Sequence, residues 1–261
     1  MGDLRGRVVA GIPALIFAGV VVWAGGPWFA AALVVLGIAC LHELFTLFER
    51  AAPPKLAGFL GLVALVVAAA LGDVEHVLLV LVATFPVLFG LTAAGPRSSA
   101  MGVAVVVLGL TWVGLAFAHA MLLRELPHGG GILADVLVGT LVGDSGAYFG
   151  GRAFGRRRLA ARISPKKSWE GLWIGLVAAV VSVWFAGLYQ DWLSGTDALL
   201  LGLAVGVAAP LGDLFQSHLK RDAGVKDTGR LFGAHGGALD RLDALMWTAV
   251  TAYWVWRALL P

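Results

Sequence analysis

Residues Ser217 to Asp243 read SHLKRDAGVKDTGRLFGAHGGALDRLD and join two apolar segments of the chain. These 27 residues include four basic side chains before residue 231, four carboxylates, two histidines and a Gly-Gly pair. The rest of the chain is mostly apolar. Such a dense polar segment between two apolar ones predicts a site with a chemical role.

The segment before this stretch, residues 197–216, predicts an apolar helix that continues into the polar residues. On that helix Asp213, Ser217 and Lys220 share one face, and Arg221 lies beside them. A carboxylate and a hydroxyl one turn apart can hold a hard cation, and a Lys-Arg pair can hold phosphate oxygens. The spacing therefore predicts a site for a nucleotide and a metal ion.

On the other side of the stretch, a His-Gly-Gly run at residues 235–237 precedes an apolar helix whose first turns carry Asp240 and Asp243. Glycines let a backbone come close to a ligand, and the free N–H groups of a helix start attract an anion. We therefore expect Asp213 and Asp240 to face each other across one bound metal ion.

The whole pattern resembles the signature of the phosphatidate cytidylyltransferases, also called CDP-diacylglycerol synthases. Its fixed positions are all present, as Ser217, Lys220, Arg221, Lys226, Asp227, His235, Gly236, Gly237, Asp240, Arg241 and Asp243. The resemblance implies an enzyme of phospholipid biosynthesis that converts CTP and phosphatidate into CDP-diacylglycerol and pyrophosphate.

The composition independently predicts an integral membrane protein. Of the 261 residues 59% are hydrophobic and only 13% are charged, and the mean hydropathy is +0.88. A bilayer core of about 30 Å takes roughly 20 apolar residues per helix. The predicted fold class is an all-α, polytopic transmembrane bundle of about nine spans, near residues 8–24, 28–48, 56–72, 75–93, 101–123, 131–151, 170–190, 196–219 and 239–258.

The basic residues predict the orientation of these spans. With a cytoplasmic N-terminus, 17 Lys and Arg residues fall on the inner side and 2, Arg124 and Arg257, on the outer side, as the positive-inside rule requires. We expect a multi-pass protein of a bacterial-type inner membrane whose active site faces the cytoplasm. The sequence pI is about 9.3. Because this distribution of basic residues explains it, we expect no nucleic-acid partner.

The two halves of the single predicted domain differ in chemistry. Residues 1–125 are expected to form scaffold and dimer spans, and residues 131–258 the catalytic spans and cytoplasmic loops. In the first half Cys40 is interpreted as a core residue and His119 as a packing or hydrogen-bonding group. His42 and Glu43 are the exception, because an ionisable residue inside a membrane helix costs about 2.5–3.5 kcal/mol; a structural or interfacial role and a functional one both stay open.

Two further segments carry chemistry in the second half. Asp144 lies in the run DSGAYF, and a basic segment ends in SPKKSWEG at residues 164–171. Ser168 is expected to cap the next helix, where Lys166 and Lys167 would be unfavourable unless an anion joins them. Both segments also resemble the family, so the resemblance covers roughly residues 140–250.

The predicted roles follow from the reaction, because a phosphomonoester dianion needs no general base to attack the α-phosphorus of CTP. Asp213 and Asp240 are predicted to hold Mg²⁺, with Asp144 and Asp243 as further carboxylates, and a second cation such as K⁺ is compatible with the same ligands. The predicted catalytic residues are Asp213, Asp240, Lys220, Arg221 and Lys226, and the predicted substrate-binding residues are Asp144, Lys166, Lys167, Ser217, His235, Gly236, Gly237 and Arg241. The role of His235 stays open between a phosphate contact and loop shape.

The partners implied are CTP, phosphatidate, membrane lipid and, from the resemblance, a second copy of the chain in a homodimer. A transporter is the main alternative from another class, because intramembrane carboxylates and broken helices also serve ion-coupled transport. A polyprenol or phytol kinase shares the chemistry of the site and is the alternative within the enzymes.

Overall fold

The computed structural model describes residues 16–94, 99–229 and 236–260 of the chain, and these are almost entirely helical. Residues 16–24 are helical. The helices that follow are α2 (Gly26–Leu47), α3 (Lys55–Leu71), α4 (Val74–Ala94), α5 (Ala100–Gly109), α6 (Leu115–Glu125), α7 (Gly129–Phe154), α8 (Trp169–Gly187), α9 (Gly195–Asp222) and α10 (Leu239–Leu259). Each lies on a predicted span, with α5 and α6 sharing one.

The helices confirm a polytopic, all-α membrane fold. Among the described residues, six helices are long and apolar enough to cross a membrane, and α3 is apolar but shorter, with 17 residues. One of the six runs from Ala100 to Glu125, because the π-helical turn η2 (Leu110–Gly114) continues α5 into α6. Large apolar side chains cover the outer faces of the bundle, as in α4, where Leu79, Val82 and Phe89 are exposed. Such faces suit contact with lipid.

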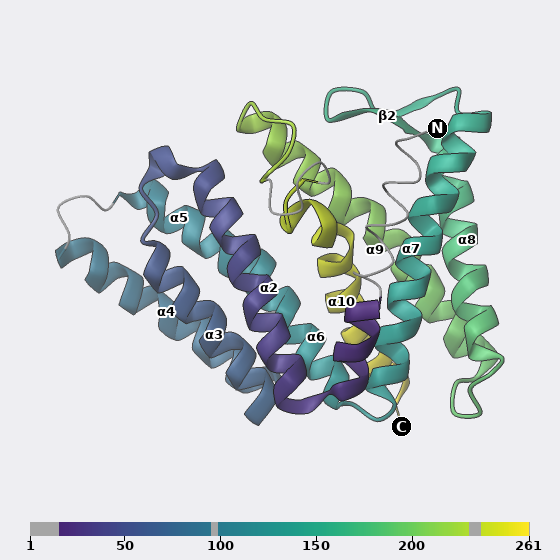
Figure 1. The fold of residues 1–261 in the computed structure, drawn as a ribbon, viewed down its shortest axis with the longest axis horizontal. Helices are drawn as coiled ribbons and strands as arrows, with labels where there is room; N and C mark the ends of the chain where they lie inside the picture. The colour runs from purple at the N-terminus through teal and green to yellow at the C-terminus, as the bar shows by residue number, and fades with distance from the viewer. Residues whose placement is uncertain (1–15, 95–98, 230–235, 261) are drawn as a thin grey trace.

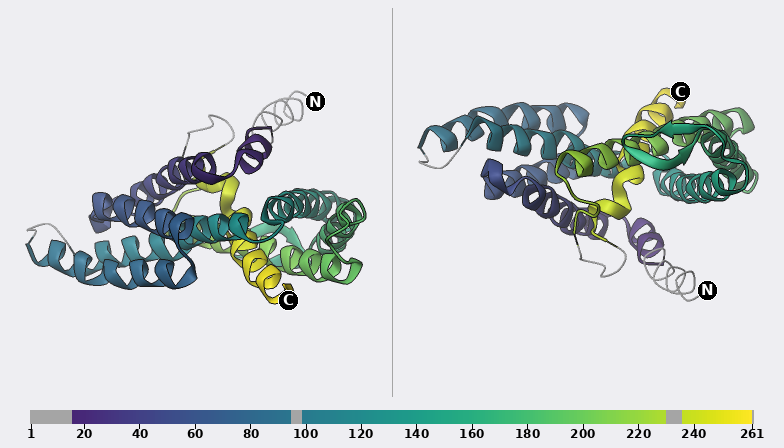
Figure 2. Two further views of the ribbon diagram at one scale, coloured as in Figure 1. Left: turned by 90° about the horizontal axis from the view of Figure 1, so that it is seen from below. Right: turned by 90° about the horizontal axis from the view of Figure 1, so that it is seen from above.

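The helices form two groups with α10 between them (Figure 1). Helices α2 to α6 make up one group, and α7, α8 and α9 make up the other. Views from below and above show α10 lying between the groups (Figure 2), and it contacts α9 and α7 on one side and α6 and α2 on the other. Helix α10 therefore joins the first half of the chain to the second.

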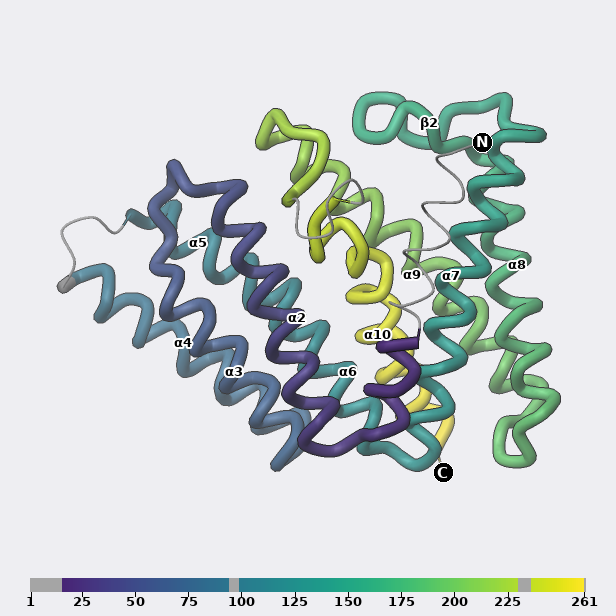
Figure 3. Tube along the Cα trace, viewed as in Figure 1, coloured from purple at the N-terminus to yellow at the C-terminus, as the bar shows by residue number. Residues whose placement is uncertain are grey.

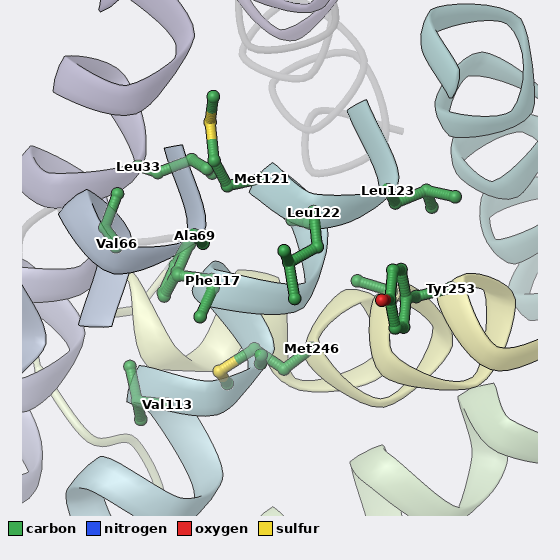
Figure 4. Close-up of a cluster of buried hydrophobic side chains, with 14 of the residues drawn as sticks. Leu33, Val66, Ala69, Val113, Phe117, Met121, Leu122, Leu123, Met246 and Tyr253 are labelled. Atoms are coloured by element: carbon green, nitrogen blue, oxygen red, sulfur yellow. The ribbon is translucent and has the colours of Figure 1, made fainter. Parts of the chain in front are cut away.

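Apolar side chains hold α10 against the first group. Met246 and Tyr253 of α10 belong to one cluster of buried side chains with Phe117 and Leu123 of α6, and Leu33 and Val66 add to it from α2 and α3 (Figure 4). Because lipid is as apolar as these side chains, close packing rather than exclusion of water holds such helices together. The cluster fixes the position of the helix that carries Asp240.

Two predictions for the first half are confirmed by this core. Cys40 is fully buried. His119 is buried and its Nδ1 lies 2.7 Å from the carbonyl oxygen of Leu115, while its ring meets that of Tyr253 at 5.2 Å between centroids.

Small residues bring α7 and α8 together in the second group. A Cβ atom on Gly175 of α8 would lie only 2.8 Å from the carbonyl oxygen of Gly143 in α7. A larger side chain at either glycine would force the helices apart, as is typical of small residues at membrane helix contacts. The close approach sets Asp144, the residue after Gly143, beside the amino-terminal half of α8.

A short β-hairpin departs from the expectation that the chemistry would lie on helices and short loops. Strand β1 (Arg158–Ala160) pairs antiparallel with β2 (Ser164–Ser168). The hairpin lies at the end of the bundle where α9 ends and α10 begins (Figure 3). We call this end the site end, and the opposite end, where α6 is followed by α7, the far end.

Candidate active site

The carboxyl-terminal turns of α9 carry the first polar cluster of the site end. As the helical spacing predicted, Ser217 lies one turn from Asp213, and its hydroxyl donates to the Oδ1 of Asp213 at 3.2 Å. Gln216 and Lys220 of the same helix point toward α10, where both contact Asp240. Helix α9 thus contributes the carboxylate of Asp213, the hydroxyl of Ser217 and the amine of Lys220 to the site.

Lys167 of the hairpin reaches this face of α9. Its Nζ lies 2.6 Å from the Oδ2 of Asp213, and both side chains stay partly exposed, at 25% and 38%. Ser168, the next residue, caps α8 by accepting the N–H of Gly171 at 3.2 Å. The predicted cap is therefore confirmed, and it anchors the strand that carries Lys167, while Lys166 is exposed beside it.

Asp240 at the start of α10 accepts four hydrogen bonds. Its Oδ1 receives Lys220 Nζ at 2.8 Å and Gln216 Nε2 at 3.2 Å. Its Oδ2 receives the backbone N–H groups of Thr228 at 2.9 Å and Gly237 at 3.1 Å. The carboxylate is 9% exposed, so it is held in one orientation by α9 and by the loop before α10.

Two more carboxylates lie near Asp213. The negative charges of Asp213 and Asp144 both act on Asp243, and the charge of Asp213 also acts on Asp144. Lys167 and Lys220 oppose them, since Lys167 acts on Asp144 and Lys220 on Asp243. Four acidic side chains from α7, α9 and α10 thus share one end of the bundle with two lysines.

The carboxylates fit Mg²⁺ by their chemistry, although the predicted arrangement across one ion remains a prediction. In the part of the chain that the structure describes, no three His, Cys, Asp or Glu side chains form a ready-made metal site. Asp213 and Asp240 instead each contact a lysine. Mg²⁺ commonly takes only one or two carboxylates and completes its shell with water and substrate phosphates, so the donor set suits an ion that arrives with a nucleotide.

The remaining basic residues surround this cluster. Arg221 donates from Nε to the carbonyl oxygen of Ile163 at 3.3 Å, which connects α9 to the hairpin. Lys226, in the loop after α9, and Arg241, one residue after Asp240, are exposed. His235 lies outside the described residues, so its role stays a prediction.

The Gly-Gly pair meets protein carboxylates rather than open space. Gly236 has a φ of +81°, and a Cβ there would lie 2.8 Å from Asp240 Oδ2. The N–H of Gly237 already bonds to Asp240, and a Cβ on Gly237 would overlap the carboxylate of Glu43. The expectation of free amides at this helix start is therefore wrong for Gly237, Ala238 and Leu239, because their N–H groups bind the carboxylates of Asp240 and Glu43.

Glu43 is the residue of this region whose role the sequence left open. It is 6% exposed, and its oxygens accept the N–H groups of Ala238 at 2.8 Å and Leu239 at 2.9 Å and the hydroxyl of Thr228 at 3.1 Å. Its neighbour His42 is exposed. The signal in the sequence was an ionisable residue inside an apolar span, but nothing local named its partners.

The comparisons with known proteins show the family of the chain. The model of the cytidylyltransferase family matches residues 5–259. The chain belongs to this family. The resemblance read from the motifs is thereby confirmed.

Individual relatives carry a more specific name. Phosphatidate cytidylyltransferase of Pseudomonas aeruginosa is 37% identical over 221 residues, which cover 83% of this chain and 72% of that protein. The protein of the same name from Haemophilus influenzae is 45% identical over 123 residues, or 45% of this chain and 43% of that protein. That from Synechocystis is 44% identical over 137 residues, or 50% and 45%. Most of these matches span about half the length of the relative.

Proposed function

We propose that this chain is a phosphatidate cytidylyltransferase, which transfers CMP from CTP to phosphatidate and yields CDP-diacylglycerol and pyrophosphate. The observation that carries the proposal is the Lys167–Asp213 ion pair. It joins the SPKKSWEG segment to the face of α9, so that the basic and acidic motifs lie in one site. The names of the relatives point to the same reaction.

The reaction asks little covalent chemistry of the protein. A phosphate oxygen of phosphatidate attacks the α-phosphorus of CTP, the new P–O bond forms, and the bond to the β-phosphate breaks as pyrophosphate leaves. The attacking phosphate is largely dianionic near neutral pH and needs no base. Catalysis therefore rests on aligning two polyanions and balancing the charge of the leaving group.

Lysines of the site fit this task. In the structure Lys167 and Lys220 each contact a carboxylate. On nucleotide binding we expect their amines to turn to phosphate oxygens, with Lys166, Arg221 and Lys226 as further phosphate contacts. Lys167 and Lys220 are held in place by Asp213 and Asp240 before the substrate arrives, so little side-chain freedom is lost when it binds.

Asp213 and Asp240 are the residues that would hold Mg²⁺, with Asp144 and Asp243 as further carboxylates and Ser217 as a neutral oxygen. Mg²⁺, when bound, would withdraw charge from the phosphate oxygens. We also propose that a second cation, such as K⁺, binds at the same site. His235, Gly236 and Arg241 complete the proposed substrate contacts.

The site end is proposed to face the cytoplasm of an inner membrane, with nine spans and the N-terminus on the same side. Lys167 and Lys220 lie at the site end, whereas Arg124 and Arg257 lie in the last turns of α6 and α10 at the far end. This distribution follows the positive-inside rule. The acyl chains would stay in the bilayer while the phosphate headgroup enters the site.

The division of labour and the oligomeric state are also proposals. We propose that residues 1–125 supply the scaffold and the surface of a homodimer, and that residues 131–258 supply the catalytic elements. Helix α4 is available for such a surface, because only 11% of its apolar window is buried within one chain. Cross-linking through single cysteines on α4 tests it, since Cys40 is buried.

The test of the proposed activity is a choice of acceptors. The purified protein in liposomes receives radiolabelled CTP and Mg²⁺ with phosphatidate, a polyprenol or phytol. We expect label from the α-phosphate in CDP-diacylglycerol and none in the alcohols. Transfer of the γ-phosphate to an alcohol would instead assign a kinase, and CTP-independent solute uptake would assign a transporter.

A further inference from the structure

Glu43 and Asp240 bind the same loop from two sides. Thr228 donates its N–H to Asp240 and its hydroxyl to Glu43. At the start of α10, the N–H of Gly237 goes to Asp240, and the next two N–H groups, of Ala238 and Leu239, go to Glu43. Thr228 and the first residues of α10 are therefore held between a carboxylate of the proposed active site and a carboxylate of α2.

The carboxylate of Glu43 is closely enclosed by the protein. The side chain is 6% exposed, and the backbone approaches so closely that a Cβ on Gly229 or Gly237 would overlap its carboxylate. A buried carboxylate is stable only when hydrogen bonds replace its water, and these three come from the loop and the first residues of α10. Moving the loop would break them together.

We propose that Glu43 is a positioning residue of the active site: by holding Thr228 and the start of α10, it keeps the carboxylate of Asp240 in its working orientation. It touches neither reactant and acts through the loop. The inference rests on the proposed function, in which Asp240 serves the nucleotide and its metal ion. It also gives the first half of the chain, which is proposed to be a scaffold, a share in catalysis.

The principal test is Glu43→Gln, which keeps the size of the side chain but removes one acceptor and places an amide against backbone donors. Because loss of a residue that supports a metal ligand typically lowers metal affinity or activity about 10- to 100-fold, we expect kcat or the apparent Mg²⁺ affinity to fall by that factor. The matched control is Asp135→Asn. Asp135 is also a buried carboxylate, 2% exposed, but it pairs with Gln190 toward the far end and should leave both quantities unchanged.

A second readout does not depend on turnover. Hydrogen–deuterium exchange, resolved to single amides, is compared in wild type, Glu43→Gln and Asp135→Asn. A simple helix cap would protect only Ala238 and Leu239, the amides that Glu43 binds. The positioning role predicts faster exchange also at Thr228 and Gly237, whose acceptor Asp240 is unchanged.

Thr228 gives an independent pair of variants if Glu43→Gln does not fold. Thr228→Val removes the hydroxyl bond to Glu43 and leaves the N–H bond to Asp240, so it should lower kcat severalfold. Thr228→Ser keeps the hydroxyl and should restore activity.

A folded Glu43→Gln with wild-type kcat, Mg²⁺ dependence and exchange at Thr228 and Gly237 would overturn the inference. So would equal activities of Thr228→Val and Thr228→Ser. If wild type itself fails to convert CTP and phosphatidate, the proposed function fails, and the exchange comparison still decides whether Glu43 fixes the loop.

Discussion

The site end and the far end of the bundle both contain polar side chains, but they use them differently. At the site end, charged side chains meet one another, as in the pairs Lys167–Asp213 and Lys220–Asp240. At the far end, Arg124 and Trp256 instead bind the backbone: Arg124 donates to the carbonyl oxygen of Val22 at 2.9 Å, and Trp256 to that of Pro127 at 2.8 Å. A phosphate can replace a carboxylate beside a lysine, whereas a backbone bond in a packed turn serves only the fold.

The largest effect should follow from removing a carboxylate at the site end. Asp213→Asn and Asp240→Asn keep the shape of the side chain but remove its charge. We expect each to lower the rate of CMP transfer about 100- to 1,000-fold, because the carboxylate would hold the Mg²⁺ that balances the developing charge, and loss of such stabilisation typically costs this factor. Steady-state rates at saturating Mg²⁺ measure it, and thermal unfolding in detergent checks the fold. A folded variant with near-wild-type transfer would show that this carboxylate has no role in the reaction.

Lys167→Met should have the next largest effect. It removes the amine that contacts Asp213 but keeps a long flexible side chain. A hydrogen bond to a charged group is worth about 1.5–3 kcal/mol, so we expect kcat/KM for CTP to fall roughly tenfold to 150-fold. Lys167→Arg keeps the charge and should recover part of the loss. If the Met and Arg variants are equally active, Lys167 binds no phosphate.

Ser168→Ala tests the anchor of the hairpin rather than its charge. Loss of a helix cap typically lowers the free energy of unfolding by about 1 kcal/mol. We expect lower thermal stability and only a small change in kcat, because Lys167 keeps its charge. Ser168→Thr retains the hydroxyl and serves as the control; a destabilised Thr variant would show that the cap is not the cause.

Arg124→Gln at the far end should change activity least. The bond to Val22 stabilises the contact between residues 16–24 and the end of α6, so its loss should lower stability by about 1 kcal/mol. The CTP KM and kcat should equal those of wild type. A clear fall in either would break the contrast between the two ends.

Local patterns in the sequence were enough to predict the helices, the family and part of the site. Apolar runs placed the helices, and the spacing of Asp213 and Ser217 on one helical face predicted their contact. The hydroxyl of Ser168 before Trp169 predicted a helix cap. Each of these features depends on residues within a few positions of one another.

Contacts between distant segments could not be predicted in the same way. Apolar spans are interchangeable by composition, so nothing in the run around Glu43 indicates that it meets Thr228 and Ala238 far along the chain. The hairpin lacks the alternation of apolar and polar residues that marks a strand. Its proximity to α9 depends on the close packing of α7 and α8.

In the proposed site Asp213 and Asp240, from different helices, serve one ion and one nucleotide, and a double-mutant cycle shows whether they do. Residual kcat/KM for CMP transfer is measured for Asp213→Asn, Asp240→Asn and the double variant. If both carboxylates act as a unit, the double variant should be about as impaired as the worse single one, because effects within one unit are not additive. Losses that multiply would show that the two carboxylates act independently and do not share an ion.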